Sequence, residues 1–229
     1  MPASYLPDLE NTTPELTTPR TRIRITTRKR RVTNARKPAH VAEALDFWSF
    51  AGAAANVVLQ LGWPEVAYGV MESKVESGSL MHHPWKRART TTQYLAVAVL
   101  GSEEERAAFR EAVNTAHRHV HSDSESPVKY NAFNKELQMW VAACLYIGFE
   151  DTHQLLHGVM NEEEAEAFYQ SGKPLATTLQ VPDSMWPATR ADFDHYWNVG
   201  CERVVIDDKT CDFLNDLVDL KMINPLIRL

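Results

Sequence analysis

The sequence predicts an all-α fold in a single helical domain that follows an extended basic arm. Three observations support this. Apolar residues recur at helical spacing almost throughout from residue 39 onward, and helix-capping patterns precede several of these segments. The two short strand-like runs, 21–27 and 203–206, could pair but do not define a sheet. A chain of 229 residues with 44% hydrophobic residues and no internal repeat is sufficient for one buried core.

The first helices of the domain are separated by a turn. Apolar spacing predicts a helix over 41–61, ended by Gly62 and Pro64, and then a short helix over 65–73. Pro84 suits the first turn of a helix that runs to Leu100, and Gly101 follows as its C-terminal stop.

The next helix has the clearest start in the sequence. Ser102 and Glu105 form a capping-box pattern, in which a side chain at each end satisfies a backbone N–H of the first turn. We expect the helix to end in the polar loop 122–127. One face is expected to carry Phe109, Val113, Ala116, His117 and Val120.

The second half of the chain contains the predicted core helix. Asn134 is expected to cap this apolar helix over 135–157, and Asn161, followed by three glutamates, to begin another. Thr189 is expected to cap a helix over 190–204, and 210–221 forms the last one. Cys201 and Cys211 have no metal-ligand spacing and are expected to be core residues.

Residues 1–38 are predicted to form the arm, and residues 39–229 the domain. The arm carries nine cations between Arg20 and Lys37 and no acid there, whereas the rest of the chain has an acidic excess. We expect the arm to contact its own acidic domain, a neighbouring subunit or an anionic surface. Nucleic acid is not an expected partner, because no aromatic residues alternate with these cations. The cations are Arg20, Arg22, Arg24, Arg28, Lys29, Arg30, Arg31, Arg36 and Lys37.

The sequence predicts a cytoplasmic protein without a membrane span. The N-terminus lacks the basic start and apolar middle of a secretory signal, and polar residues interrupt the most apolar stretch, 47–70. The three cysteines form neither a C-x-x-C motif nor an even set for disulfides, which indicates a reducing compartment.

His117 is the residue that most suggests a cofactor. A lone imidazole on an apolar helix face is commonly a satisfied core residue, but it also suits a neutral metal ligand in a water-poor slot. Arg87 and Thr91, four residues apart, lie on one side of the preceding helix and could serve the polar groups of a bound haem. His119 points away from the apolar face.

Five ordered segments resemble one family, the MpaB-type and latex-clearing-protein oxygenases. The segment 60–67, QLGWPEVA, is similar to the family's QLxHPxVA turn, and 84–91, PWKRARTT, resembles its PWxRLxRT helix. The segment 113–120, VNTAHRHV, resembles its VxxxHxxV haem helix. Residues 130–141 resemble YxAxxPELxxWV, and 181–197 the VP, LPxT and DFxxYW close.

This resemblance implies a globin-related helical bundle that binds haem b, with His117 as the proximal ligand of the iron. It implies cofactor contacts for Arg87, Thr90, Thr91 and His121. It also implies an oxygenase that acts with O2 on an apolar, isoprenoid or otherwise unsaturated small molecule. Arg87 and Thr91 are the implied catalytic residues, together with Glu72, which lies near where some relatives place a catalytic carboxylate. A solvent-exposed helix position is the other interpretation of Glu72.

The chain also departs from the family pattern at five positions. Thr90 stands where rubber-cleaving relatives can offer a lysine as sixth ligand. Asn114 and His121 replace arginines near the haem histidine, and Trp63 and Ala142 replace histidines.

Two alternatives to a haem oxygenase stay open. One is a non-catalytic haem-binding or helical interaction protein that uses the basic arm for its partner. The other is a di-iron carboxylate bundle, because two pairs have the spacing of di-iron ligands, with Glu65 and Glu136 as further carboxylates. These pairs are Glu150 with His153 and Asp192 with His195.

Overall fold

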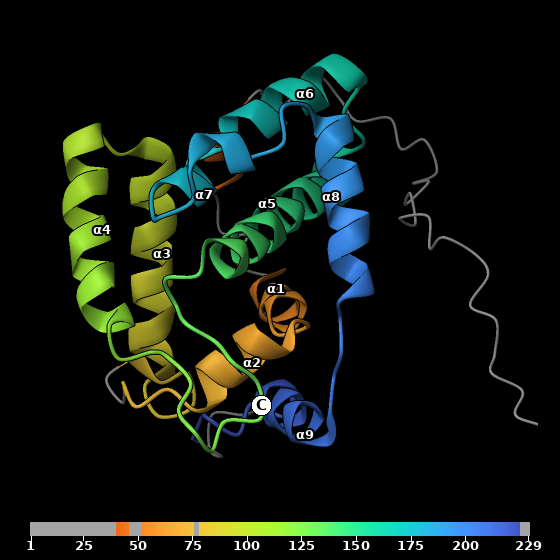
Figure 1. Ribbon diagram of the computed structural model, residues 1–229. Helices are drawn as coiled ribbons and strands as arrows, with labels where there is room; N and C mark the ends of the chain where they lie inside the picture. The colour runs from red at the N-terminus through yellow and green to blue at the C-terminus, as the bar shows by residue number, and fades with distance from the viewer. Residues whose placement is uncertain (1–39, 46–51, 76–77, 225–229) are drawn as a thin grey trace, which may run out of the picture.

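The computed structural model describes residues 40–45, 52–75 and 78–224, and these are mainly helical (Figure 1). The predicted all-α class is confirmed for this part of the chain. Its helices, in order, are the 3-10 helix η1 (Val41–Ala44), α1 (Ala53–Gln60), α2 (Pro64–Met71), α3 (Pro84–Leu100), α4 (Glu103–His117), α5 (Lys135–His157), α6 (Glu162–Ser171), α7 (Pro174–Thr177), the 3-10 helix η4 (Asp183–Met185), α8 (Arg190–Glu202) and α9 (Asp208–Val218).

Helix α5 runs through the middle of the molecule, as its apolar sequence predicts. The side chain of Asn134 accepts hydrogen bonds from the backbone N–H groups of Glu136 and Leu137 and so caps its first turn. Helices α1 and α7 pack directly on α5, and the α3–α4 pair and α8 lie on either side of it (Figure 1). Because neighbours surround α5, it is buried on most of its circumference rather than along one stripe.

Three stacked indoles join the turn between α1 and α2 to α5 and α8. The rings of Trp63 and Trp140 stack with centroids 4.6 Å apart, and Trp140 stacks on Trp197 at 5.1 Å. The Trp63 indole N–H donates to the carbonyl of Gly200 at 2.8 Å. The guanidinium of Arg203 lies 3.6 Å from the centre of the Trp63 ring and covers the open end of the stack.

Helices α3 and α4 form an antiparallel hairpin beside the core (Figure 1). Ser102 and Glu105 make the predicted capping box at the start of α4. Helix α4 contributes no fully buried residue, although Phe109, Val113 and His117 are half-buried. Its amphipathic face is therefore only partly covered by the described chain.

Several helix ends differ from the predicted ones. Helix α4 ends at His117, because the N–H of Val120 bonds to the His117 carbonyl in a tight turn, so Val120 is not on the helix. Helix α8 ends at Glu202, because residues 203–206 leave it as an extended loop in which Val205 bonds to Gly62. Helix α9 covers Asp208–Val218 rather than 210–221, since the Asp207 side chain caps it.

The N-terminal part of the domain also differs from the prediction. The helix expected over 41–61 is observed as η1 and α1, with 46–51 outside the described residues. The short α7, which begins at Pro174, was not predicted. The basic arm and the strand-like run 21–27 lie outside the described residues as well.

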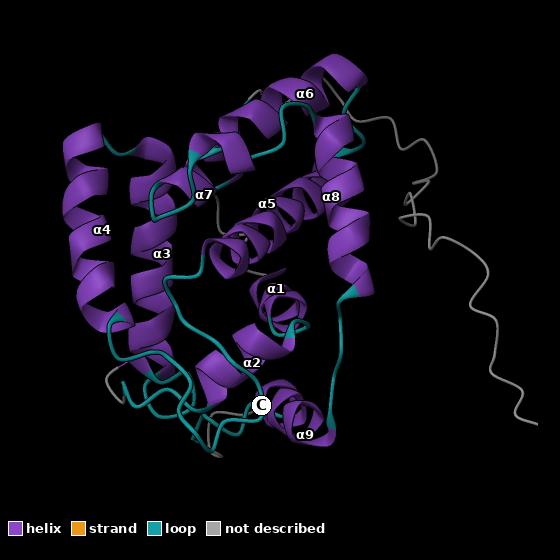
Figure 2. Cartoon of the chain, viewed as in Figure 1, coloured by secondary structure: helices purple, strands orange, loops and turns teal. Residues whose placement is uncertain are grey.

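The described residues form no strand, only one isolated bridge between His121 and Asn131 (Figure 2). The prediction that Cys201 and Cys211 are core residues was wrong, because both are exposed, whereas Cys144 is buried. All three cysteines are free thiols. Among the described helices, none combines the length and the apolar character that crossing a bilayer requires.

Candidate functional site

His117 is the last residue of α4 and lies at the half-covered face of that helix. Its ring meets Phe133 edge-on, with centroids 6.3 Å apart. Its Nδ1 atom is buried and has no hydrogen-bond partner among the described residues. Burial and the nearby charge of Arg87 both lower the pKa of the imidazole, which keeps the ring neutral at physiological pH. A neutral imidazole is the form that binds a metal.

Arg87 faces His117 from α3, the other helix of the hairpin. Arg87 is exposed, but desolvation by the surrounding protein lowers the pKa of its guanidinium. The structure therefore brings together Arg87 and His117, two of the residues predicted for the site.

Thr90 and Thr91 follow Arg87 on the exposed part of α3. The hydroxyl of Thr90 donates to the backbone carbonyl of Lys86 at 2.9 Å, so its hydrogen is used within the helix. Thr91 lies one turn beyond Arg87 and shares its helical face.

Glu72, at the C-terminal end of α2, lies in a second polar hollow. Its carboxylate accepts hydrogen bonds from the Ser126 hydroxyl at 2.7 Å, the Tyr130 hydroxyl at 3.2 Å and the Lys209 ammonium at 3.3 Å. Burial opposes ionisation of Glu72, but these donors outweigh it and lower the pKa of the carboxyl group. Glu72 is thus an ionised, partly buried acceptor and not the solvent-exposed residue of the alternative interpretation.

His121 and His119 line this same hollow with Glu72 rather than contacting His117. The hollow measures about 560 Å³ and is open to solvent. His121 is exposed, and its Nδ1 lies 3.3 Å from the Ser122 carbonyl. The predicted site residues thus fall into two groups, Arg87 and His117 between α3 and α4, and Glu72 with His121 beside the loop that follows α4.

Three amide side chains form a chain of hydrogen bonds one turn before His117. Gln180 Nε2 donates to Asn114 Oδ1 at 2.5 Å, and Gln138 Nε2 donates to Gln180 Oε1 at 2.6 Å. Gln138 also donates to the Ala132 carbonyl at 2.7 Å, next to Phe133, the residue that meets the His117 ring. These amides join α4, α5 and the 180 loop behind His117. Sequence reasoning missed them because their partners lie 42 and 66 residues apart.

The residues of the di-iron alternative serve other roles in the structure. Glu150 is fully buried and accepts two hydrogen bonds from Arg190, at 2.8 and 2.6 Å. Asp192 completes the capping box of α8 with Thr189. No group of three or more histidine, cysteine or carboxylate side chains arranged to hold a metal occurs in the described part of the chain.

Comparison with known proteins gives the family. Residues 41–229 match the catalytic domain described as ER-bound oxygenase mpaB/B′/rubber oxygenase. The chain belongs to this family. The match includes α3 and α4 and therefore both Arg87 and His117. This confirms the resemblance that the sequence motifs indicate.

Two curated relatives are similar over a large part of the chain. Uncharacterized proteins of Mycobacterium bovis and Mycobacterium tuberculosis are each 54% identical to it over 154 residues. The matched region makes up 67% of this chain and 60% of each relative. No solved structure matches.

Proposed function

We propose that this protein is a haem b-dependent oxygenase that uses O2 on an apolar small molecule of the isoprenoid or another unsaturated class. The proposal builds on membership in an oxygenase family. The observation that carries it is His117, a neutral imidazole close to Arg87, whose buried Nδ1 has no hydrogen-bond partner among the described residues. The globin-related architecture, the cytoplasmic location and the partner of the basic arm stay predictions.

The side chains of His117, Arg87 and Thr91 fit a haem group chemically. An imidazole that is kept neutral at the half-covered face of α4 can bind iron without first losing a proton. Arg87 remains a cation and can pair with a propionate or another anionic oxygen, while Thr91 can donate a hydrogen bond on the same helical side. When bound, haem supplies a redox-active iron for O2 chemistry.

Thr90, Glu72 and His121 have separate proposed roles. Thr90 borders the cofactor without a nitrogen to offer to iron, and its hydroxyl stays bonded to its own helix. Glu72 is ionised and can accept a proton at a carboxylate already oriented by Ser126. His121, in the same hollow, is proposed to lie toward the edge of the cofactor.

Haem titration of the purified protein tests the proposal. We expect a Soret band that depends on His117 and is lost or strongly shifted in His117→Ala. The matched control is His119→Ala, which removes an exposed imidazole two residues away and should leave the band unchanged. Absence of a Soret band after haem supplementation, or equal spectra for both variants, would contradict haem ligation by His117.

Oxygen consumption then separates an oxygenase from a haem-binding protein without catalysis. The haem-loaded protein should consume O2 in the presence of isoprenoid or unsaturated lipid test substrates, and Glu72→Gln should slow this reaction without removing the Soret band. A stable haem complex that consumes no O2 with any test substrate would favour the non-catalytic alternative.

A further inference from the structure

The N-terminal turns of α3 present an indole and two cations to solvent. Trp85 is 75% exposed, and Lys86 and Arg89 are exposed beside it. Neither cation has an ion-pair partner in the described part of the chain, whereas nearby Lys74 and Arg118 pair with acids. Exposed His82 and His83 immediately precede the helix. We call Trp85, Lys86 and Arg89, with these two histidines, the α3 surface.

The α3 surface lies on a different side of α3 from Arg87 and Thr91. At about 100° per residue, Trp85, Lys86 and Arg89 fall within about one third of the circumference of α3. Arg87 and Thr91 fall roughly opposite. A partner that binds the α3 surface would therefore leave the side of α3 that carries Arg87 and Thr91 uncovered.

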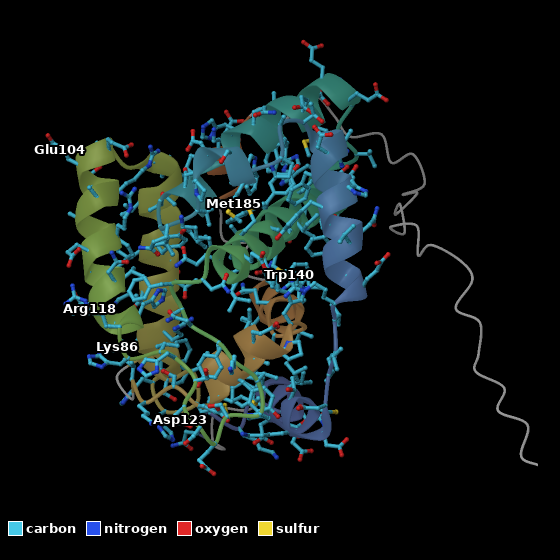
Figure 3. All side chains as sticks on the ribbon, in the orientation of Figure 1. Lys86, Glu104, Arg118, Asp123, Trp140 and Met185 are labelled. Carbon is cyan, nitrogen blue, oxygen red and sulfur yellow. The ribbon has the colours of Figure 1, made fainter. Side chains whose placement is uncertain are left out.

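Charge is distributed unevenly along the α3–α4 hairpin. Near the end that carries the α3 surface, Arg118 is paired with Glu111 and Asp123 with Lys74, and the opposite end carries Glu104 (Figure 3). Three consecutive glutamates begin α4 at that opposite end. No acid occurs between residues 77 and 102, although the whole chain has a formal net charge of −6. An anionic surface would therefore attract this end of the hairpin and repel much of the remaining molecule.

We propose that the α3 surface binds the anionic headgroup layer of a phospholipid membrane, with Trp85 inserted at the interface. An indole is stable where an apolar ring and a polar N–H meet water, and adjacent cations bind lipid phosphates. The N-terminus of α3, a helix of 17 residues, adds its partial positive charge at the same place. This inference rests on the proposed oxygenase function, because docking would hold the protein at a phase that dissolves apolar substrates.

Vesicle binding of the full chain tests the proposal, and it needs no haem. The protein should sediment with vesicles of phosphatidylcholine mixed with phosphatidylglycerol, and not with phosphatidylcholine alone. Trp85→Ala should weaken this binding about tenfold. Lys86→Glu combined with Arg89→Glu should weaken it at least about 25-fold, at about fivefold for each lost cation. Leu100→Ala is the matched control, because Leu100 is 66% exposed at the other end of α3 and should have no effect.

Fluorescence separates the α3 surface from the basic arm, which is also cationic. Brominated phosphatidylcholine in the anionic vesicles should quench tryptophan emission, and Trp85→Phe should remove this quenching. Absence of vesicle binding, or vesicle binding without quenching and unchanged in the α3 variants, would overturn the proposal. The proposal would also be overturned if Trp85→Ala bound both heparin and anionic vesicles as strongly as the wild type. That result would indicate binding to polyanions in general rather than to a membrane. Because haem titration is a separate assay, failure here leaves the proposed function standing.

Discussion

Gly200→Ala tests the packing of the tryptophan stack. A Cβ atom at Gly200 would lie 2.7 Å from Cζ3 and 3.1 Å from Cε3 of Trp140. Trp140 cannot easily yield, because it is stacked on both faces and its indole N–H donates to the Gln60 carbonyl at 3.1 Å. Overpacking of this kind costs about 1–3 kcal/mol. Replacing glycine by alanine within a helix recovers up to about 1 kcal/mol.

The net expectation for Gly200→Ala is a loss of about 1–2 kcal/mol in the free energy of unfolding, measured by urea titration. For a domain of this size the thermal midpoint should fall by about 2–8 °C. Gly69→Ala in α2 is the control, because its new Cβ would meet nothing closer than Tyr130 at 3.4 Å. That variant should be neutral or slightly stabilising. If Gly200→Ala were as stable as Gly69→Ala, the stack would be looser than the structure indicates.

Four further variants probe His117, the residues near it and a buried ion pair. Arg87→Gln should raise the pKa of His117, seen by NMR titration, because a nearby positive charge is removed; an unchanged pKa would separate the two side chains. The pKa of His117 is lowered in the folded state, so the unfolded state takes up the proton first as the pH falls. The free energy of unfolding of the wild type should therefore decrease as the pH drops below about 6.5. His117→Gln should make the free energy of unfolding less dependent on pH in this range. Arg190→Met should cost about 3–5 kcal/mol in urea titration because it leaves the Glu150 carboxylate buried without this cation, and a much smaller loss would show that other partners suffice. Gln180→Leu should cost about 1–3 kcal/mol by breaking the amide chain, and no loss in thermal or urea unfolding would argue against that chain.

Local sequence signals predicted the helix starts well, because the hydrogen bonds that form a helix start join residues close together in the sequence. The caps at Ser102, Asn134, Asn161 and Thr189 all form as predicted, because a capping side chain bonds to backbone groups two or three residues away. Helix ends were predicted less well. The loop after α8 is fixed by the Val205 bond to Gly62, a contact between distant segments that no local pattern encodes.

The candidate site shows the same limit. Helical phase selected His117 from three neighbouring histidines, and in the structure the charge of Arg87 acts on its imidazole. Phase could not show that Glu72 is bonded by Ser126 and Tyr130, because the loop that carries these donors lies more than 50 residues downstream. The amide chain behind His117 was hidden for the same reason.

Three departures from the family pattern have structural reasons in this chain. Trp63, at a position of a family histidine, stacks on Trp140 and bonds to a backbone carbonyl. Asn114, at a position of a family arginine, supplies the oxygen that accepts from Gln180, and an arginine could not replace it because a guanidinium has no acceptor. The hydroxyl of Thr90 is satisfied within its own helix. Each of these three side chains is therefore held by contacts within this chain.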